Sequence, residues 1–271
     1  MKIITCLSNA KQMGYVHALA SSCNYFGLEL VTLQTEKWST HRQKDELFQR
    51  YLQTQNPEEL VFFSDAYDTI FTNTEAEILE KYAMLSKPGK ILMSGNRICS
   101  PDHKLGRSFK STTYGYDFPN TGGMIGKVKD FRNILNQVAK TNAVDKSKEN
   151  MSYRWSNQYL WAKTIIKYPD LVDIDTSCHI FQTMTNQKVL DELHKYKSIE
   201  PDLSHEEDLY KRESIKNVIA NMLQEIEITN DLKIHNKSTH TYPTHIHFNS
   251  EINKLTMFME PFVKLVQTYN E

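Results

Sequence analysis

Apolar runs and amphipathic segments alternate along the first half of the chain. Runs of five or six mainly apolar residues are typical of β-strands, and apolar side chains at every third or fourth position are typical of helices. The predicted strands are residues 3–7, 28–33, 60–64 and 90–94. The predicted helices are residues 14–26, 40–53 and 74–85. This alternation predicts an α/β fold with a mostly parallel central sheet and helices on both of its faces.

Local signals mark the ends of two of these helices. Gly27 follows the first helix, as is typical of a C-terminal cap. Thr74 precedes the third helix, and acidic residues follow it, which predicts an N-terminal cap. The strand at residues 60–64 carries no charge, so we expect both of its faces to be buried.

The second half of the chain has a less regular pattern. It predicts helices from about residue 130 and over residues 156–168, and two short strands within residues 172–182. Residues 99–120 are irregular, aromatic and polar, and we expect a loop over a site there. The charged stretch 188–231, with an insertion near 199–231, is helical in pattern, and a last helix is expected over about 254–269.

The composition is that of a globular protein. Of 271 residues, 39% are hydrophobic, which is enough for a core, and the net charge of −1 without a basic block argues against binding to nucleic acid or anionic membranes. The apolar run at the N-terminus is too short for a signal peptide, and no run reaches the roughly 18 residues of a membrane helix. We expect a soluble protein without a signal peptide, in the cytoplasm of a cell or host.

The four cysteines show no CxxC spacing, which argues against a zinc site built on them. Cys6, Cys23 and Cys178 lie among apolar residues and are expected to be buried thiols. A reducing compartment is the simplest context, and the sequence leaves a disulfide open.

Two carboxylates directly follow the apolar strand in the stretch ELVFFSDAYDTIFTN. Asp65 and Asp68 would lie at the carboxyl end of a parallel strand, where open α/β sheets bind ligands. Their charges repel unless a cation lies between them, and Mg²⁺ or Mn²⁺ would leave coordination positions for a diphosphate. In the alternative interpretation, Asp65 lies in a turn and Asp68 caps the next element.

Two further signals lie downstream. The paired glycines of NTGGMIG, residues 120–126, would let the backbone approach a sugar or phosphate, or would form a tight bend at a strand entry. His247 is either a core residue or a metal ligand. The other late histidines, His235, His240 and His245, lack the spacing of a zinc site.

Taken together and in this order, the motifs resemble the glycosyltransferase domain of multifunctional procollagen lysyl hydroxylases. The resemblance covers roughly residues 1–182 and 243–253 and runs through ITCLSNAKQMGY, RQK, VFFSDAYDTIF, SGNRICSP, PNTGGMIG, DTSCHIFQ and HFN. It implies a nucleotide-diphospho-sugar transferase of the GT-A type, Rossmann-like, as a single domain over residues 1–271. The nucleotide-binding half would be residues 1–130, and the acceptor-side half residues 131–271.

The resemblance also implies a Mn²⁺ site. Asp65 and Asp68 match the family's metal-binding aspartates, which hold Mn²⁺ against the donor diphosphate, and His247 matches the third ligand. A mixed set of oxygen and nitrogen ligands suits Mn²⁺. Asp65 thereby also belongs to the donor-binding residues.

Further residues match the family's donor pocket. Tyr67 matches a tyrosine that packs on the uracil ring, Lys44 and Lys254 are candidates for phosphate contact, and Thr5 would bind the nucleotide. The remaining residues of the implied cleft are Asn120, Thr121 and Gly122 beside the sugar and acceptor, with Gln182 and Asn249 lining the same space.

The implied reaction moves a hexose, with glucose expected, from a UDP-sugar to a hydroxyl acceptor. The acceptor would be a protein, such as a collagen-like chain with glycosylated hydroxylysine, and the family retains the anomeric configuration. The metal and nearby lysines would stabilise the negative charge on the departing UDP.

The sequence departs from the family pattern near its presumed catalytic residues. The family carries a run of aspartates where this chain has Ser156 and Asn157, and a tryptophan where it has Ser100. Asn157 and Asn120 are the candidate catalytic residues here, with Trp155 or Asp173 as candidates to compensate. These departures leave a second hypothesis open, a non-catalytic module that binds UDP and metal.

Overall fold

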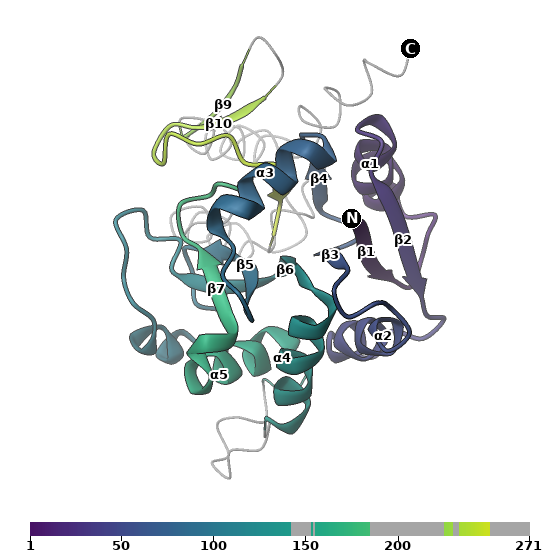
Figure 1. Ribbon diagram of the computed structural model, residues 1–271, viewed down its shortest axis with the longest axis vertical. Coiled ribbons are helices and arrows are strands. Elements are labelled where there is room, and N and C mark those ends of the chain that lie inside the picture. Colours follow the sequence, from purple (N-terminus) through teal and green to yellow (C-terminus); the bar gives the residue numbers. More distant parts are fainter. Residues whose placement is uncertain (142–152, 154, 185–224, 230–232, 250–271) are drawn as a thin grey trace, which may run out of the picture.

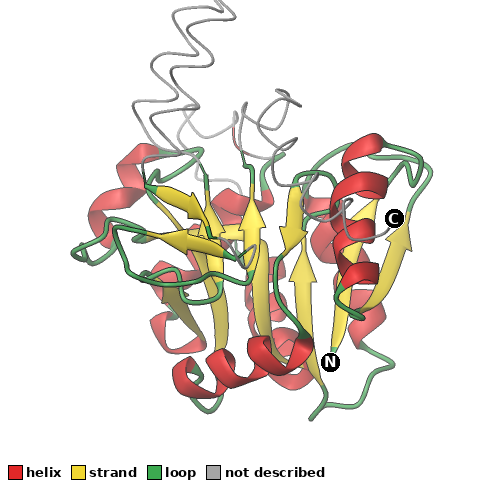
Figure 2. Ribbon diagram, turned by 90° about the horizontal axis from the view of Figure 1, so that it is seen from above, coloured by secondary structure: helices red, strands yellow, loops and turns green. Residues whose placement is uncertain are grey.

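A six-stranded sheet, in the order β2-β1-β3-β6-β5-β7, forms the centre of the fold. The computed structural model describes residues 1–141, 153, 155–184, 225–229 and 233–249. The strands of this sheet are β1 (Lys2–Leu7), β2 (Glu29–Gln34), β3 (Leu60–Ser64), β5 (Ile91–Asn96), β6 (Phe118–Lys127) and β7 (Val172–Asp175). Neighbouring strands are parallel except at β6, which runs antiparallel to both β3 and β5. The predicted α/β fold with a mostly parallel sheet is confirmed (Figure 2).

Helices cover both faces of this sheet (Figure 1). The helices are α1 (Ser21–Tyr25), α2 (Arg42–Leu52), α3 (Glu75–Leu85), α4 (Val128–Lys140) and α5 (Asn157–Lys167). The α2, α4 and α5 helices share one core cluster with Phe63, and α1 and α3 share the other with Phe62. Successive residues of a strand face opposite sides, and both phenylalanines are fully buried. The β3 strand is therefore buried on both faces, as its uncharged sequence predicts.

The predicted helix ends are also confirmed. Thr74 and Glu77 form a capping box at the start of α3, in which each side chain satisfies a backbone N–H of the other residue. Gly27 has a φ of +64°, the left-handed conformation expected of a C-terminal cap. The segment before it differs from the prediction, because a short π-helix (Tyr15–Ala20) precedes α1. Apolar spacing over so few residues does not distinguish the two kinds of helix.

A second, three-stranded sheet lies in the order β4-β11-β8. Its strands are β4 (Thr69–Phe71), β8 (Phe181–Thr183) and β11 (His245–His247). The late strand β11 is antiparallel to β4 and parallel to β8, so it joins two segments that precede it in the sequence. The two strands predicted within residues 172–182 are confirmed as β7 and β8. The β4 strand is too short to predict from an apolar run.

A two-stranded ribbon, β9 (Ile226–Ile228) with β10 (Ile234–Asn236), completes the described fold and lies beside α3 (Figure 1). Residues 226–228 were expected to be helical and are extended here. The rest of the charged insertion and the expected last helix lie outside the described residues. Within the expected loop at residues 99–120, a 3₁₀ helix (His103–Ser108) forms and β6 begins at Phe118. Among the described helices, none has the length and apolar character to cross a membrane.

Candidate functional site

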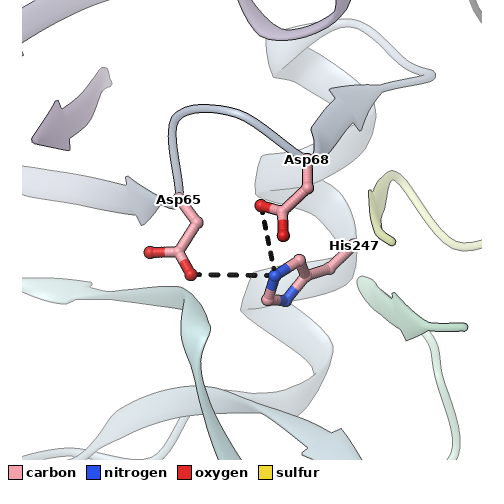
Figure 3. A group of neighbouring side chains, drawn as sticks. All are labelled: Asp65, Asp68 and His247. Atoms are coloured by element: carbon pink, nitrogen blue, oxygen red, sulfur yellow. Dashed lines mark ion pairs between the residues drawn. The ribbon is translucent and has the colours of Figure 1, made fainter. Parts of the chain in front are cut away.

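Three side chains converge at the carboxyl end of β3. Asp65 directly follows β3, Asp68 precedes β4, and His247 ends β11. One ligand atom from each lies within 4.8 Å of the other two. The Nε2 atom of His247 is 3.4 Å from Asp68 Oδ1 and 3.7 Å from Asp65 Oδ2 (Figure 3). No other such group of three or more occurs within the described ranges, so the late histidines apart from His247 build no metal cluster there.

His247 is oriented by a neighbour on β6. Its Nδ1 lies 3.0 Å from the side-chain oxygen of Asn120, which also accepts the backbone N–H of Gly122 at 2.9 Å. If Nδ1 carries the proton and donates to this oxygen, Nε2 presents a lone pair to the two carboxylates. Burial lowers the pKa of His247, but the charges of Asp68 and Asp65 outweigh it and raise this pKa above its ordinary value. The pair of carboxylates thus attracts positive charge.

The two oxygens of Asp65 face different partners. Oδ1 accepts a hydrogen bond from the buried Lys44 ammonium at 2.7 Å, and Oδ2 faces His247. Lys44 Nζ also lies 3.4 Å from both oxygens of Thr121. Burial lowers the pKa of Lys44, and Asp65 outweighs burial and raises it. A fixed ammonium next to two carboxylates and an imidazole nitrogen fits a site for a divalent cation with a phosphate beside it.

Gly122 makes room for these ligands. A Cβ at this position would lie 2.0 Å from His247 Cε1 and 2.9 Å from Asp65 Oδ2, and the Gly122 carbonyl accepts the backbone N–H of Asp65 at 2.9 Å. The pairing of β5 with β6 shifts register between Met93 and Ser94, opposite this segment. The glycines were expected to admit a sugar or phosphate or to form a bend. They lie within β6 beside this register shift, and the protein atoms closest to Gly122 belong to His247 and Asp65; the approach of a sugar or phosphate stays a prediction.

Gln158 is a site residue that the sequence reasoning missed. Its side-chain oxygen accepts the backbone N–H of Thr121 at 2.9 Å, and its amide donates to the carbonyl of Pro119. It therefore holds β6 on both sides of Asn120. A polar residue in the first turn of a helix is ordinary, so the residue type alone does not indicate this role.

Tyr67 and Thr5, both predicted to contact the nucleotide, make hydrogen bonds close to the two aspartates. Tyr67 lies between Asp65 and Asp68, and its hydroxyl accepts the backbone N–H groups of Ser8 at 3.1 Å and Asn9 at 2.9 Å. It thereby ties the loop after β1 to the aspartates. Thr5 is fully buried and donates to the carbonyl of Ser64 at 2.8 Å. Its side chain supports the end of β3 and does not face a cleft.

Asp173 does not belong to the site. It lies on the edge strand β7, which β5 and β6 separate from β3, and its carboxylate pairs with Lys87 at 3.1 Å and Lys90 at 3.2 Å. Compensation for the missing acids by Asp173 is therefore wrong, because the structure commits Asp173 to ion pairs elsewhere. The sequence predicts a strand around Asp173, but it does not show where in the sheet this strand lies.

Gln182 is also placed differently from the prediction. It is buried, donates to the hydroxyl of Tyr116 at 2.9 Å and accepts from Asn236 at 2.7 Å. This closed network lies in the interior, so Gln182 does not line a cleft. Asn249 is buried as well and accepts the backbone N–H of Met184 at 3.2 Å, while Lys254 lies outside the described residues.

Asn157 and Ser156 both have structural partners. Ser156 caps α5 by accepting the backbone N–H of Tyr159 at 3.3 Å. The Asn157 amide donates to Asp45 at 3.1 Å. Burial raises the pKa of Asp45 to about 6, although Lys44 and Asn157 partly offset this effect.

Comparison with known proteins decides the family. The model of the PLOD GT domain family matches residues 2–213, well over half of the chain. The chain belongs to this family. Its fold is of the GT-A type, as in mouse xyloside xylosyltransferase 1 in its apo form, which matches with a TM-score of 0.50 and 10% identity over 93% of this chain and 98% of that one. At this identity the likeness shows the fold alone.

Three relatives of this PLOD GT domain match over shorter segments. A procollagen-lysine,2-oxoglutarate 5-dioxygenase of Drosophila melanogaster is 37% identical over 26% of this chain and 10% of its own length. A multifunctional procollagen lysine hydroxylase and glycosyltransferase of Caenorhabditis elegans is 26% identical over 46% of this chain and 16% of its own. Uncharacterized protein R699 of Acanthamoeba polyphaga mimivirus is 25% identical over 46% of this chain and 25% of its own. Each match spans a quarter or less of the relative.

Proposed function

We propose that the protein is a metal-dependent glycosyltransferase that moves a hexose, with glucose as the expected sugar, from a UDP-sugar to a hydroxyl acceptor. The Asp65, Asp68 and His247 cluster at the carboxyl end of β3 is the observation that carries the proposal. The family and the GT-A fold supply the reaction class. The names of the relatives from fly and worm refer to procollagen lysine, and the proposed acceptor, glycosylated hydroxylysine of a collagen-like chain, follows the family resemblance.

Mn²⁺ is the proposed ion, held by Asp65, Asp68 and His247. Bound there, it would neutralise charge on the diphosphate of the donor. The chain's own residues supply the rest. Asn120 holds His247 in the ligating orientation, and Lys44 places a fixed positive charge beside Asp65, where a phosphate oxygen would gain a second partner. Retention of the anomeric configuration is part of the proposal and follows the family resemblance.

UDP release tests the proposal directly. Purified protein would be incubated with Mn²⁺ and a panel of UDP-sugars, with free galactosyl-hydroxylysine or a glycosylated collagen peptide as acceptor. We expect one donor to be used, and turnover to fall by at least about 100-fold in Asp65→Asn, because the substitution removes a charged ligand. Glu58→Gln, an exposed carboxylate in surface ion pairs with Lys127 and Lys129, is the matched control and should retain activity. Equal turnover in Asp65→Asn and wild type would refute the metal assignment.

A non-catalytic module that binds UDP and metal is the second candidate. The observation in its favour is that Ser156 and Asn157, where the family pattern has acids, are engaged in a helix cap and in a hydrogen bond to Asp45. Calorimetry with UDP and Mn²⁺ separates the two functions. Saturable binding without transfer or hydrolysis of any donor would favour the module.

A further inference from the structure

A hollow in the described part of the protein lies away from the metal-ligand cluster. Its volume is about 430 Å³, and it opens between α3, the turn before β8 and residues 233–242. The β4 and β11 strands connect the two regions, with Asp68 and His247 at one end and Asn73 and Tyr242 at the other. Five residues along these strands correspond to roughly 16 Å. None of the three candidate metal ligands lines the hollow.

The lining carries more positive than negative groups. Lys81, Lys233, His179 and His240 contribute basic side chains, and Glu77 is the carboxylate among the residues that line the hollow. Both oxygens of Glu77 are committed. One accepts from the backbone and hydroxyl of Thr74, and the other pairs with Lys233 at 3.2 Å. Lys233 and Glu77 thus balance each other.

Lys81 is left with surplus charge. It donates to the carbonyl of Tyr242 and forms no ion pair with a carboxylate in the described part of the chain. An ammonium has three N–H donors, so two remain for a ligand. The carboxylates of Glu77, Asp175 and Glu80 act on Lys81 through space, and the oxygens of Asp175 accept the backbone N–H groups of residues 179–181. Burial lowers the pKa of Lys81, so a counter-anion would stabilise its charged form.

Backbone conformation marks the same place. The described residues other than glycine with positive φ are Cys178, at 53°, and His240, at 57°. The first directly precedes His179, and the second lines the hollow itself. Such conformations are unfavourable for residues with a side chain and are concentrated at ligand sites. Both histidines are therefore presented by segments whose backbone the fold constrains.

We propose that this hollow is a second ligand site, which binds the oxyanion group, carboxylate or phosphate, of a small molecule about the size of a monosaccharide. A volume of 430 Å³ is within the range of small-molecule pockets. Lys81 is the primary partner of the oxyanion, and His179 and His240 flank it. The exposed Tyr242, whose ring stacks on His235, offers its hydroxyl to the rest of the ligand. This site is independent of the proposed transfer reaction.

The test titrates the full chain with inorganic phosphate and, separately, with citrate, by calorimetry and by NMR of the histidine rings. We expect saturable binding that shifts the His179 and His240 signals. Lys81→Met should weaken it by about tenfold, the loss expected for one charge-assisted hydrogen bond. Lys81→Arg should retain most of it. Lys237→Met is the matched control, because it removes one exposed charge from the same segment, residues 233–242, without changing the lining of the hollow, and it should bind as wild type does.

Repeating the titration in Asp65→Asn separates this site from the donor site. Binding that persists there supports the second site even if the transferase proposal fails. A preference for phosphate or citrate identifies the group, and equal binding supports the shared oxyanion chemistry. The proposal is overturned if neither probe binds saturably, if binding disappears in Asp65→Asn, or if Lys237→Met weakens it as much as Lys81→Met does.

Discussion

Adding one methyl group at Gly122 should disable the metal-ligand cluster. In Gly122→Ala the new Cβ would lie 2.0 Å from His247 Cε1 and 2.3 Å from His247 Nδ1. Carbon atoms in contact are about 3.5–4.0 Å apart, so the ring must retreat by about 1.5 Å or more. His247 is buried and bonded to Asn120, so little space exists for this movement.

Gly122→Ala should lower both the stability of the protein and its affinity for Mn²⁺. Overpacking of this kind typically destabilises a protein by about 1–3 kcal/mol. Displacing the His247 nitrogen also removes one of three ligands from reach, for which we expect Mn²⁺ affinity to fall by at least about 100-fold, or about 2.8 kcal/mol. The loss of Mn²⁺ affinity is specific to this site, because it follows from the contact between the new methyl group and the His247 imidazole.

Urea unfolding and Mn²⁺ titration calorimetry measure these two losses. Gly106→Ala is the control, because its Cβ would come no closer than 3.3 Å to the Phe118 ring and 3.4 Å to Cys99 Cβ. The double variant Gly122→Ala/His247→Ala gives the sharpest result. Removing the ring should recover stability relative to Gly122→Ala alone, while metal affinity stays low. If the double variant is no more stable than Gly122→Ala, or if Gly122→Ala binds Mn²⁺ like wild type, the clash does not exist as described.

Three further substitutions test the charges around the metal-ligand cluster, the buried Asp45 and the cap of α3. Lys44→Met leaves Asp65 without its ammonium partner and should lower the free energy of unfolding in EDTA by about 1–2 kcal/mol. The loss should be smaller in Mn²⁺, because the ion would replace the positive charge beside Asp65. Equal losses in both buffers would count against a metal ion that binds next to Lys44. The pKa of Asp45 is raised by burial from 3.8 to about 6, so its neutral form stabilises the fold, fully below 3.8 and less as the pH rises through 6. Asp45→Asn should therefore gain up to about 3 kcal/mol over wild type in urea unfolding at pH 8 and almost nothing at pH 3.5, and a gain independent of pH would contradict this. Thr74→Ala removes half of the capping box with Glu77 and should lower the unfolding free energy by about 1 kcal/mol, whereas an unchanged thermal midpoint would show that the box contributes nothing.

Local patterns predicted the elements that depend on local physics. The charge-free β3, the cap at Thr74 and the left-handed Gly27 follow from the residues themselves and are confirmed. The three-residue strand β4 was missed, because its pairing with β11 is set by distant residues. Strand order is likewise non-local, which is why Asp173 was placed near the site although it lies at the sheet edge.

The candidate site also separates into features that the sequence predicts and features that depend on non-local packing. The family resemblance implied the Asp65, Asp68 and His247 cluster, whereas the residues alone left a turn open for the aspartates and a core position for His247; the structure brings the three residues together. Gln182 was misplaced because an amide suits both a cleft and a buried network, and only packing selects between them. Gln158 was missed because its partners are backbone groups of another element, which leave no trace in side-chain identity.

The position of β11 between β4 and β8 has a consequence for biosynthesis. A ribosome translates Asp65 and Asp68 long before it reaches His247, so the emerging chain carries two neighbouring carboxylates without their imidazole partner. The third ligand arrives only when the late strand inserts between two segments that are already present. Capture of the proposed ion would therefore wait until β11 has paired with β4 and β8, and the ion would then join segments that lie far apart in the sequence.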